Sequence, residues 1–380
     1  MADAVVPGKR GPEQLDEGAA ALVAPDRHCQ QGLQEGYTIA DDVPFSRVLD
    51  HASGKMRPYR ERGKEKKTVC HWGQRKLMVS EMEFITKFYD KAKIVVYAGA
   101  APGTHIPCLA QLFPKLRFVL VDPRPFSSDV VKLAKSTALT GSSGPGIELH
   151  VGFFSDDMAR EYAREEGVLF ISDVRTSDGR GEGATMPPQD VVFPTQQSVE
   201  GDMELQQRWH GLMRPVASSL KFRLPWDDGG TTSYLRGDIS LPVWGGVSTT
   251  ECRLFVEGCV RGADEDGACA GSELVVYDNK MYEQQMFYFQ THSRIARYKN
   301  DFVEFYKCSC FDCTSEAAVL SSFLATVCGK ATVLLSEVSE LSKRLDHACH
   351  RDHRNPRTLF DANLDPTERK TRILKRQRRA

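Results

Sequence analysis

Five short apolar runs in the middle of the chain constrain its fold more than any other feature. They lie at residues 94–97, 118–121, 168–171, 216–220 and 253–256. Runs of this length and composition are typical of strands buried in a sheet, and the segments between them are long enough for crossover helices. The pattern therefore predicts an α/β fold with a doubly wound, mostly parallel sheet.

Two further segments have helical character. Residues 74–92 carry apolar side chains at steps of four, three and four, which is typical of one face of an amphipathic helix. This face consists of Met78, Met82, Ile85 and Tyr89. Residues 317–344 are also predicted to be helical, with a break near Gly329. The segments 176–202 and 258–271 are rich in Gly and polar residues and are interpreted as a long loop and an insertion.

Charge is segregated along the chain, although the formal net charge is only -1. Residues 1–45 hold eight acidic and three basic residues, whereas residues 46–76 hold ten basic and three acidic residues. The last forty residues hold twelve basic and five acidic residues. We expect residues 1–45 to be a disordered acidic leader and residues 351–380 a disordered basic tail. Basic blocks of this kind favour binding to a polyanion such as RNA or DNA, although they also occur as solvated tails.

No segment of the sequence predicts export or membrane insertion. The first thirty residues lack the apolar block of a secretory signal. The longest apolar stretch without charge, residues 317–328, is far shorter than the roughly 20 residues of a membrane span. A cytosolic protein with reduced thiols is therefore expected from its eleven cysteines. Their closest grouping, Cys308, Cys310 and Cys313, does not have the spacing of a standard zinc site, so no metal is predicted.

A glycine turn follows the first predicted strand. It reads Gly99-Ala-Ala-Pro-Gly103, and Asp122 ends the next apolar run twenty-three residues after Gly99. Glycines let the backbone approach a nucleoside closely, and the carboxylate can accept both hydroxyls of a ribose. Because Ala101 stands where a dinucleotide-binding turn has its second glycine, the turn suits S-adenosylmethionine better than a nicotinamide dinucleotide.

Four polar residues stand at unusual positions. Asp173 follows the run 168–171, Lys221 lies in a largely apolar strand, and Lys76 occupies the first turn of the first helix. Desolvation would lower the pKa of Lys221 and let it act as a base, whereas the helix dipole disfavours a cation at Lys76. With Glu251 they give the order Lys-Asp-Lys-Glu. Each residue taken alone also fits a structural role, such as a capping Asp or a snorkelling Lys.

This order resembles the tetrad of RNA ribose 2′-O-methyltransferases. Residues 73–76, 95–106 with 171–175, and 215–226 further resemble blocks of the poxvirus cap-specific mRNA (nucleoside-2′-O-)-methyltransferases, which double as the processivity subunit of the viral poly(A) polymerase. The resemblance implies a Rossmann-like, S-adenosylmethionine-dependent methyltransferase domain over residues 46–350. It also implies methyl transfer to the ribose 2′-OH of the first transcribed nucleotide of m7G-capped mRNA, together with stimulation of polyadenylation.

The resemblance also implies roles for individual residues. Lys221 becomes the base, Asp173 orients it, Glu251 holds Lys76 or the ribose in place, and Lys76 keeps the pKa of Lys221 down. The cofactor-binding positions are Gln74, Tyr97, Gly99, Gly103, Asp122, Arg124, Ser155 and Asp173. The cap-binding positions are Arg223, Leu224, Pro225, Trp226, Asp228, Thr249, Thr250, Glu251 and Glu283.

In the cap pocket, an aromatic face and carboxylates would recognise the positively charged 7-methylguanine through stacking, cation–π attraction and hydrogen bonds. Two of its positions are left open by the sequence. Ser248 stands where the family has a second aromatic residue, for which Trp244, Tyr234 and Tyr59 are alternatives. Asp278 competes with Glu283 as the second carboxylate.

The resemblance implies as partners capped mRNA, the poly(A) polymerase catalytic subunit in a heterodimer, and viral RNA polymerase, with no membrane. It implies localisation in the virion and the host cytoplasm. Two other functions remain open: an RNA-binding polymerase accessory subunit without cap activity, and a ribosomal or transfer RNA 2′-O-methyltransferase.

Overall fold

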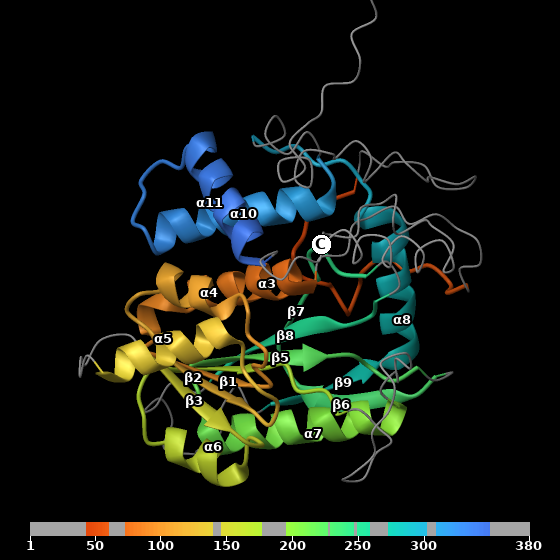
Figure 1. Ribbon diagram of the computed structural model, residues 1–380. Coiled ribbons are helices and arrows are strands. Elements are labelled where there is room, and N and C mark those ends of the chain that lie inside the picture. Colours follow the sequence, from red (N-terminus) through yellow and green to blue (C-terminus); the bar gives the residue numbers. More distant parts are fainter. Residues whose placement is uncertain are drawn as a thin grey trace, which may run out of the picture.

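A seven-stranded sheet forms the centre of the protein (Figure 1). The computed structural model describes residues 43–60, 73–139, 146–176, 195–226, 229–246, 249–258, 273–301 and 309–349. The strand order of the sheet is β3-β2-β1-β4-β5-β8-β7, and a separate two-stranded sheet pairs β6 with β9. The predicted α/β fold with a mostly parallel sheet is therefore confirmed.

Five strands are parallel to their neighbours: β1 (Ile94–Ala98), β2 (Arg117–Asp122), β3 (Ile147–Val151), β4 (Val168–Ser172) and β5 (Ala217–Phe222). Two strands are antiparallel, β8 (Cys252–Glu257) to β5 and β7 (Asp238–Ser240) to β8. All five apolar runs form strands. The central strands β1 and β4 are buried along their whole length, which explains their continuous apolar sequence.

Four strands were not predicted, namely β3, β7, β6 (Thr231–Leu235) and β9 (Leu274–Asp278). The edge strand β3 has only one fully buried residue, β6 has two, and β9 has one. Their sequences therefore lack the apolar run that identifies an interior strand.

Helices cover both faces of the large sheet (Figure 1). On one face lie α3 (Gly73–Lys87), α4 (Ile106–Leu112) and α5 (Ser128–Leu139), with α10 (Phe311–Thr326) and α11 (Leu335–Cys349) packed against α3. On the other face lie α6 (Asp156–Tyr162) and α7 (Gln196–Met213), while α8 (Asn279–Tyr288) stands beside β6 and β9. None of the helices in these ranges is both long and apolar enough to cross a bilayer.

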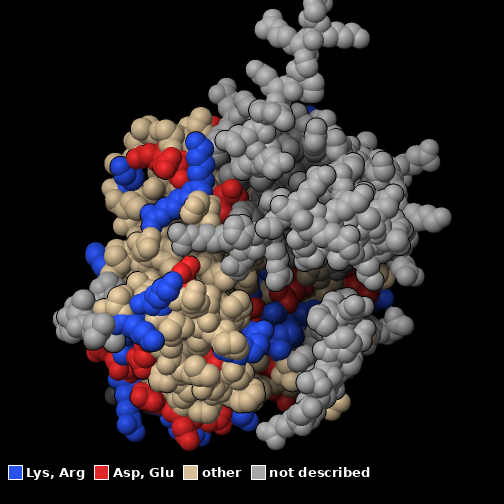
Figure 2. Space-filling model, in the orientation of Figure 1, with Lys and Arg blue, Asp and Glu red and all other residues tan. Residues whose placement is uncertain are grey.

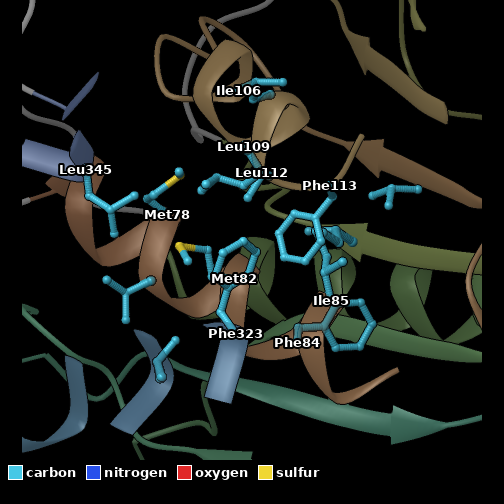
Figure 3. Packing of buried hydrophobic residues seen from close by; sticks show 14 of the residues in the cluster. Met78, Met82, Phe84, Ile85, Ile106, Leu109, Leu112, Phe113, Phe323 and Leu345 are labelled. Atoms are coloured by element: carbon cyan, nitrogen blue, oxygen red, sulfur yellow. The ribbon is translucent and has the colours of Figure 1, made fainter. Parts of the chain in front are cut away.

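The predicted amphipathic face is buried in the core along α3, whereas Tyr89 lies beyond α3 in a 3-10 turn (Tyr89–Lys91) and is only partly buried. Figure 3 shows the methionines of α3 and Ile85 among the side chains of α4 and α10. The labelled residues of this cluster are Met78, Met82, Phe84, Ile85, Ile106, Leu109, Leu112, Phe113, Phe323 and Leu345. The break predicted near Gly329 is also confirmed, since α10 and α11 are separate helices and Gly329 has a φ of 66°.

Two predicted boundaries are wrong. Phe45, inside the predicted leader, packs its ring 5.2 Å from that of Tyr298 and 5.8 Å from that of Phe311. The loop predicted over 176–202 ends in helix, because Thr195 caps α7 by accepting a hydrogen bond from the Ser198 backbone. Polar residues at the start of α7 hide this helix in the sequence. Residues 1–42, 177–194, 259–272 and 350–380, which include most of the leader, the loop, the insertion and the tail, lie outside the described residues.

Candidate functional site

The four predicted catalytic residues meet at the carboxyl edge of the parallel strands. Asp173 directly follows β4, Lys221 lies near the end of β5, and Glu251 directly precedes β8. Lys76 comes from the first turn of α3, a helix that packs on one face of the sheet. Ligands of open α/β sheets bind at this edge.

The side chains form a continuous chain of ion pairs. Lys76 Nζ lies 3.0 Å from Glu251 Oε1, and Lys221 Nζ lies 3.4 Å from Glu251 Oε2. Lys221 Nζ also lies 3.1 Å from Asp173 Oδ1. The Lys221 side chain is 12% exposed, so its nitrogen is held between two carboxylates in a partly enclosed site. The structure thus brings together residues separated by up to 175 positions in the sequence.

Two arginines complete this cluster and were not predicted. Arg253, on β8 directly opposite Lys221, donates one hydrogen bond to the Ser172 carbonyl at 2.9 Å and another to Asp173. Arg175 lies 3.8 Å from Glu251 and 3.6 Å from Asp202. Arg175 stands two residues after Asp173, and Arg253 two residues after Glu251. For Arg253, the second residue of β8, this spacing of two places side chains on one face of a strand and could have identified it, whereas Arg175 lies with Asp173 in the loop after β4, where that period does not apply.

Both carboxylates are ionised in this surrounding. Burial acts to raise the pKa of Asp173, but Lys221 and Arg253 outweigh it and lower this pKa to about 2. Burial likewise opposes the ionisation of Glu251, and the neighbouring Lys76 and Lys221 overcome it and hold its pKa well below the usual range. The cluster is therefore a fixed array of charges around the Lys221 nitrogen.

The glycine turn lies directly beside this array. Gly99 and Gly103 have φ values of 81° and 64°, which L side chains rarely adopt. A Cβ on Gly99 would stand 2.9 Å from the backbone carbon of Asp173, and one on Gly103 would stand 2.9 Å from the Ala100 carbonyl oxygen. Glycine is therefore required to bring the β1 turn against the end of β4.

Asp122 ends β2 as predicted, but its carboxylate is already bonded. It accepts hydrogen bonds from the backbone of Ala101 at 2.9 Å and of Arg124 at 2.8 Å, and the Arg124 guanidinium covers it at 3.0 Å. The Asp122 side chain is 2% exposed and that of Arg124 is 67% exposed. A ribose could reach Asp122 only if the Arg124 side chain moved.

Two other predicted cofactor-binding residues are hydrogen-bonded to side chains of α3 or of the residues that follow the glycine turn. The Tyr97 hydroxyl donates to Glu81 at 2.7 Å, and Gln74 Oε1 lies 2.9 Å from both the Thr104 hydroxyl and His105 Nδ1. Burial raises the pKa of Tyr97 well above its usual value, so its hydroxyl stays a hydrogen-bond donor. In this structure, Tyr97 and Gln74 are bonded within a buried network that links α3 to the turn.

At the neighbouring strand end the structure exposes an aromatic residue that was not predicted. Phe153, just after β3, is 83% exposed, and the register pairs Asp122 with Val151. Ser155 follows and caps α6 by accepting a hydrogen bond from the Met158 backbone at 3.3 Å. Phe153 thus stands next to the predicted ribose-binding carboxylate. Because β3 was not predicted, the sequence offered no strand end at which Phe153 could have been recognised.

The predicted cap-binding residues flank the other side of Lys221. Trp226 is 58% exposed, and the Arg223 guanidinium lies 4.8 Å from its ring centroid. Leu224 and Pro225 between them are buried, and Asp228 lies outside the described residues. The Thr249 carbonyl accepts a bond from Gln290 at 2.9 Å and the Thr250 carbonyl one from Tyr282, which ties both threonines to the α8 side of the site.

The candidates for the second aromatic residue differ in exposure. Trp244 is 1% and Tyr234 2% exposed, so neither presents a ring face to a ligand, whereas Tyr59 is 54% exposed and contacts Phe287 edge-on. Ser248 lies outside the described residues.

The two candidate carboxylates also differ. Glu283 pairs with Lys280 at 2.8 Å. Asp278 is exposed, caps α8 by accepting a hydrogen bond from the Met281 backbone at 2.7 Å, and lies opposite Thr231 in the β6–β9 register. Asp278 therefore lies at the end of the loop that carries Trp226.

Basic and acidic side chains lie close together to the right of centre on the face seen in Figure 2. Within the described ranges no group of three or more His, Cys, Asp or Glu residues could hold a metal ion. Cys310 and Cys313 are buried at the start of α10, and Cys308 lies outside these ranges.

Comparison with known proteins identifies the family. A sequence model described as "Poly A polymerase regulatory subunit" matches residues 49–323. Cap-specific mRNA (nucleoside-2′-O-)-methyltransferases from two strains of Myxoma virus are each 26% identical over 235 residues, covering 58% of this chain and 61% of theirs. The one from Fowlpox virus is 25% identical over 236 residues, covering 58% of this chain and 68% of its own. The chain thus spans less than two thirds of the length of the Myxoma virus relatives.

A solved structure of bluetongue virus VP4, described as a multifunctional RNA-capping production line, is 14% identical, with a TM-score of 0.36, and covers 67% of this chain and 39% of its own. The family match covers most of the chain, including the helix α3 and the strands β4, β5 and β8 that supply the Lys-Asp-Lys-Glu cluster. The chain therefore belongs to the poly(A) polymerase regulatory subunit family.

Proposed function

We propose that the protein transfers a methyl group from S-adenosylmethionine to the ribose 2′-OH of the first transcribed nucleotide of m7G-capped mRNA. The observation that carries this proposal is the position of Lys221, whose nitrogen lies within 3.4 Å of both Asp173 and Glu251 beside the Gly99 turn. The names of the Myxoma and Fowlpox virus relatives support it. The family match supports a second role, as the regulatory partner of a poly(A) polymerase catalytic subunit.

The cofactor would occupy the carboxyl ends of β1, β2 and β3. It supplies a methyl group activated by a positive sulfur. The Gly99 turn would admit its amino-acid part, and Asp122 would accept the ribose hydroxyls once Arg124 swings outward. Phe153 would then pack against the adenine, because a ribose on Asp122 directs the base towards the end of the neighbouring strand β3. This contact would cover the exposed ring of Phe153.

Methyl transfer to a ribose oxygen requires a positioned hydroxyl and an acceptor for its proton. Lys221 would orient the 2′-hydroxyl and, entering the step as the neutral amine, take its proton; Asp173 and Glu251 then pair with the ammonium group that forms. Asp173 and Glu251 fix the direction of its nitrogen, while Arg253 and Lys76 hold these carboxylates in turn. The cations around the site favour the negative charge that develops on the attacking oxygen.

Arg175 and Arg223 fit the RNA phosphates. Three buried guanidinium nitrogens, Nη1 and Nη2 of Arg175 and Nε of Arg223, have no hydrogen-bond partner among the described residues. The buried hydroxyl of Thr250 also has none there. Burial, and after it the positive charge of Arg175, lowers the pKa of Arg223. Two such groups bind phosphate oxygens through charge-assisted hydrogen bonds, so we assign them to the phosphates next to the reacting ribose.

Trp226 would provide a face for the 7-methylguanine, because an aromatic ring attracts a delocalised cation more strongly than a neutral base. Displacement of Arg223 from this ring would let the same residue reach the phosphates. Asp278 has the better position for the N–H groups of the base, because it lies at the end of the Trp226 loop, and Glu283 remains the alternative.

A methyl-transfer assay on short capped and uncapped RNAs tests the proposal. Wild-type protein should methylate the capped RNA, and Lys221→Met should abolish methylation while stimulation of the polymerase persists. Lys87→Met is the matched control, since Lys87 ends α3 and pairs with Asp238, the first residue of β7, away from the carboxyl ends of the parallel strands, and it should leave both activities intact. Absence of methylation by wild-type protein, or full activity of Lys221→Met, would refute the enzyme assignment.

Two other functions give different results in the same assay. An accessory subunit without cap activity would stimulate the polymerase but methylate neither RNA. A ribosomal or transfer RNA methyltransferase would methylate uncapped RNA and would not be inhibited by free 7-methylguanosine. The virion and host-cytoplasm locations and the contact with viral RNA polymerase stay predictions from the resemblance.

A further inference from the structure

Two carboxylates of α10, Asp312 and Glu316, are fully buried outside the site described above. They lie four residues apart and therefore share one face of the helix. A buried carboxylate is costly unless it is paired and hydrogen-bonded. The partners of Asp312 and Glu316 therefore indicate the role of these two residues. Burial acts to raise the pKa of Glu316, but Arg75 and the hydrogen bond from Trp244 help to lower it, and the group is ionised.

Glu316 joins two segments that both lead to the catalytic cluster. Its Oε2 accepts hydrogen bonds from Arg75 Nε at 2.7 Å and from Trp244 Nε1 at 2.6 Å, and its Oε1 accepts one from Arg75 Nη2 at 2.6 Å. Arg75 immediately precedes Lys76 on α3, and Trp244 lies in the loop that runs from β7 to Glu251. One carboxylate thus holds both sides of the Lys76–Glu251 ion pair.

Asp312 fixes the same loop through its backbone. It accepts a hydrogen bond from the Trp244 N–H at 3.0 Å and one from Arg294 Nε at 3.0 Å. Arg294 in turn donates to the carbonyl oxygens of Gly245 at 2.8 Å and Gly246 at 3.2 Å. Trp244 has a φ of 55°, a left-handed conformation that costs energy for a bulky residue. These buried bonds hold the loop in that conformation.

Stability alone does not explain the ionic groups. Replacing a buried ion pair by apolar residues of similar volume is often neutral or stabilising. Apart from these groups and the α11 residues Ser342 and Asp346, which also bond to Arg75, the interface of α3, α10 and α11 is packed with apolar side chains. What an apolar interface would not provide is a directional link between Arg75 and Trp244. The charged groups therefore indicate that the relative position of Arg75 and Trp244 matters.

We propose that Glu316 and Asp312 are positioning residues for the methyl transfer proposed above, and that they set the Lys76–Glu251 contact by fixing α3 and the Glu251 loop in one frame. This inference rests on the proposed function. A displacement of about 1 Å in a catalytic group can lower a rate by about 100-fold, so loss of this frame should lower kcat while substrate and cofactor affinities persist.

Trp244→Phe removes the indole N–H that binds Glu316 and keeps an aromatic ring. Trp209→Phe is the matched control, because Trp209 is also buried, at 4% exposure, and donates its indole N–H to Asp156 at 3.1 Å on the opposite face of the sheet. We expect Trp244→Phe to lower kcat for capped RNA by tenfold or more at saturating cofactor, on the order of the loss expected for a small misplacement. KM and the dissociation constant of S-adenosylhomocysteine should match those of Trp209→Phe.

Amide hydrogen exchange over residues 249–252 provides a readout that does not depend on activity. Exchange there should accelerate in Trp244→Phe and stay unchanged in Trp209→Phe. Equal kcat values for the two variants, or unchanged exchange in Trp244→Phe, would overturn the inference. A wild-type protein without methyl transfer would refute the proposed function instead, and the exchange comparison would still decide whether the frame exists. If Trp244→Phe fails to fold, the double variant Arg75→Met with Glu316→Met takes its place in the same measurements.

Discussion

Substitution of Asp173 by Asn should destabilise the protein in a pH-dependent way. Lys221 and Arg253 lower the pKa of Asp173 from its ordinary value of 3.8 to about 2 against the effect of burial. A shift of one pKa unit corresponds to about 1.4 kcal/mol, so the ionised carboxylate contributes about 2 kcal/mol at neutral pH. Its side chain is only 19% exposed, so solvent screens these interactions little. Asn keeps the shape of the side chain but loses this contribution and leaves two cations without their shared anion.

The direction of the pH effect follows from the sign of the shift. Because the pKa is lower in the folded than in the unfolded protein, the contribution is fully present above pH 3.8 and is lost as the pH falls through about 2. The free energy of unfolding of wild-type protein and Asp173→Asn, measured by urea titration, should therefore differ by a constant amount between pH 7 and pH 5. This difference should shrink below pH 4.

A surface aspartate provides the control. Asp238 pairs with Lys87 at 2.9 Å, and its side chain is 51% exposed, so Asp238→Asn should cost about 1 kcal/mol or less. A wild-type-like unfolding free energy of Asp173→Asn at pH 7, or a difference between the two proteins that persists undiminished to pH 2.5, would refute the reasoning.

Three further predictions concern ligands. Trp226→Ala should weaken binding of capped RNA about tenfold, since a stacked base is worth about 1 to 3 kcal/mol, with unchanged cofactor affinity in parallel titrations. Phe153→Ala should weaken S-adenosylhomocysteine binding measured by calorimetry without lowering the melting temperature, because Phe153 is 83% exposed; unchanged affinity would exclude contact with the adenine. Deletion of residues 366–380 should flatten the salt dependence of RNA binding, because fewer counterions are released, and leave turnover at saturating short capped RNA intact.

The sequence predicted the interior of the fold well and its periphery poorly. Interior strands such as β1 and β4 are buried on both sides and therefore carry continuous apolar runs. The pair β6 and β9 exposes alternate residues, and its register partners are between 39 residues (Leu235 and Leu274) and 47 residues (Thr231 and Asp278) apart in the sequence. Such pairing depends on contacts that no local pattern records.

The supporting residues of the site could not be predicted for the same reason. Motif order identified Lys76, Asp173, Lys221 and Glu251, which the structure brings into contact. Asp312 and Glu316 read as ordinary residues of a helix in the sequence, and only packing of α10 on α3 shows that both are buried. Burial of Trp244 is also a tertiary effect, and it changes that residue from a candidate cap-stacking ring into a structural anchor.

The antiparallel direction of β8 determines which residues of the site face each other. Because β8 runs antiparallel to β5, Lys221 lies directly opposite Arg253, and the period of two places Glu251 on the same face as Arg253. The intervening Cys252 faces the other side, where it packs in the apolar cluster with Leu220 and Phe222. A register slip of one residue would exchange these faces and bury Glu251 among apolar side chains. The apolar residues of β5 and β8 therefore fix the charged ones, and α3 needs only to pack on the charged face to bring Lys76 to Glu251.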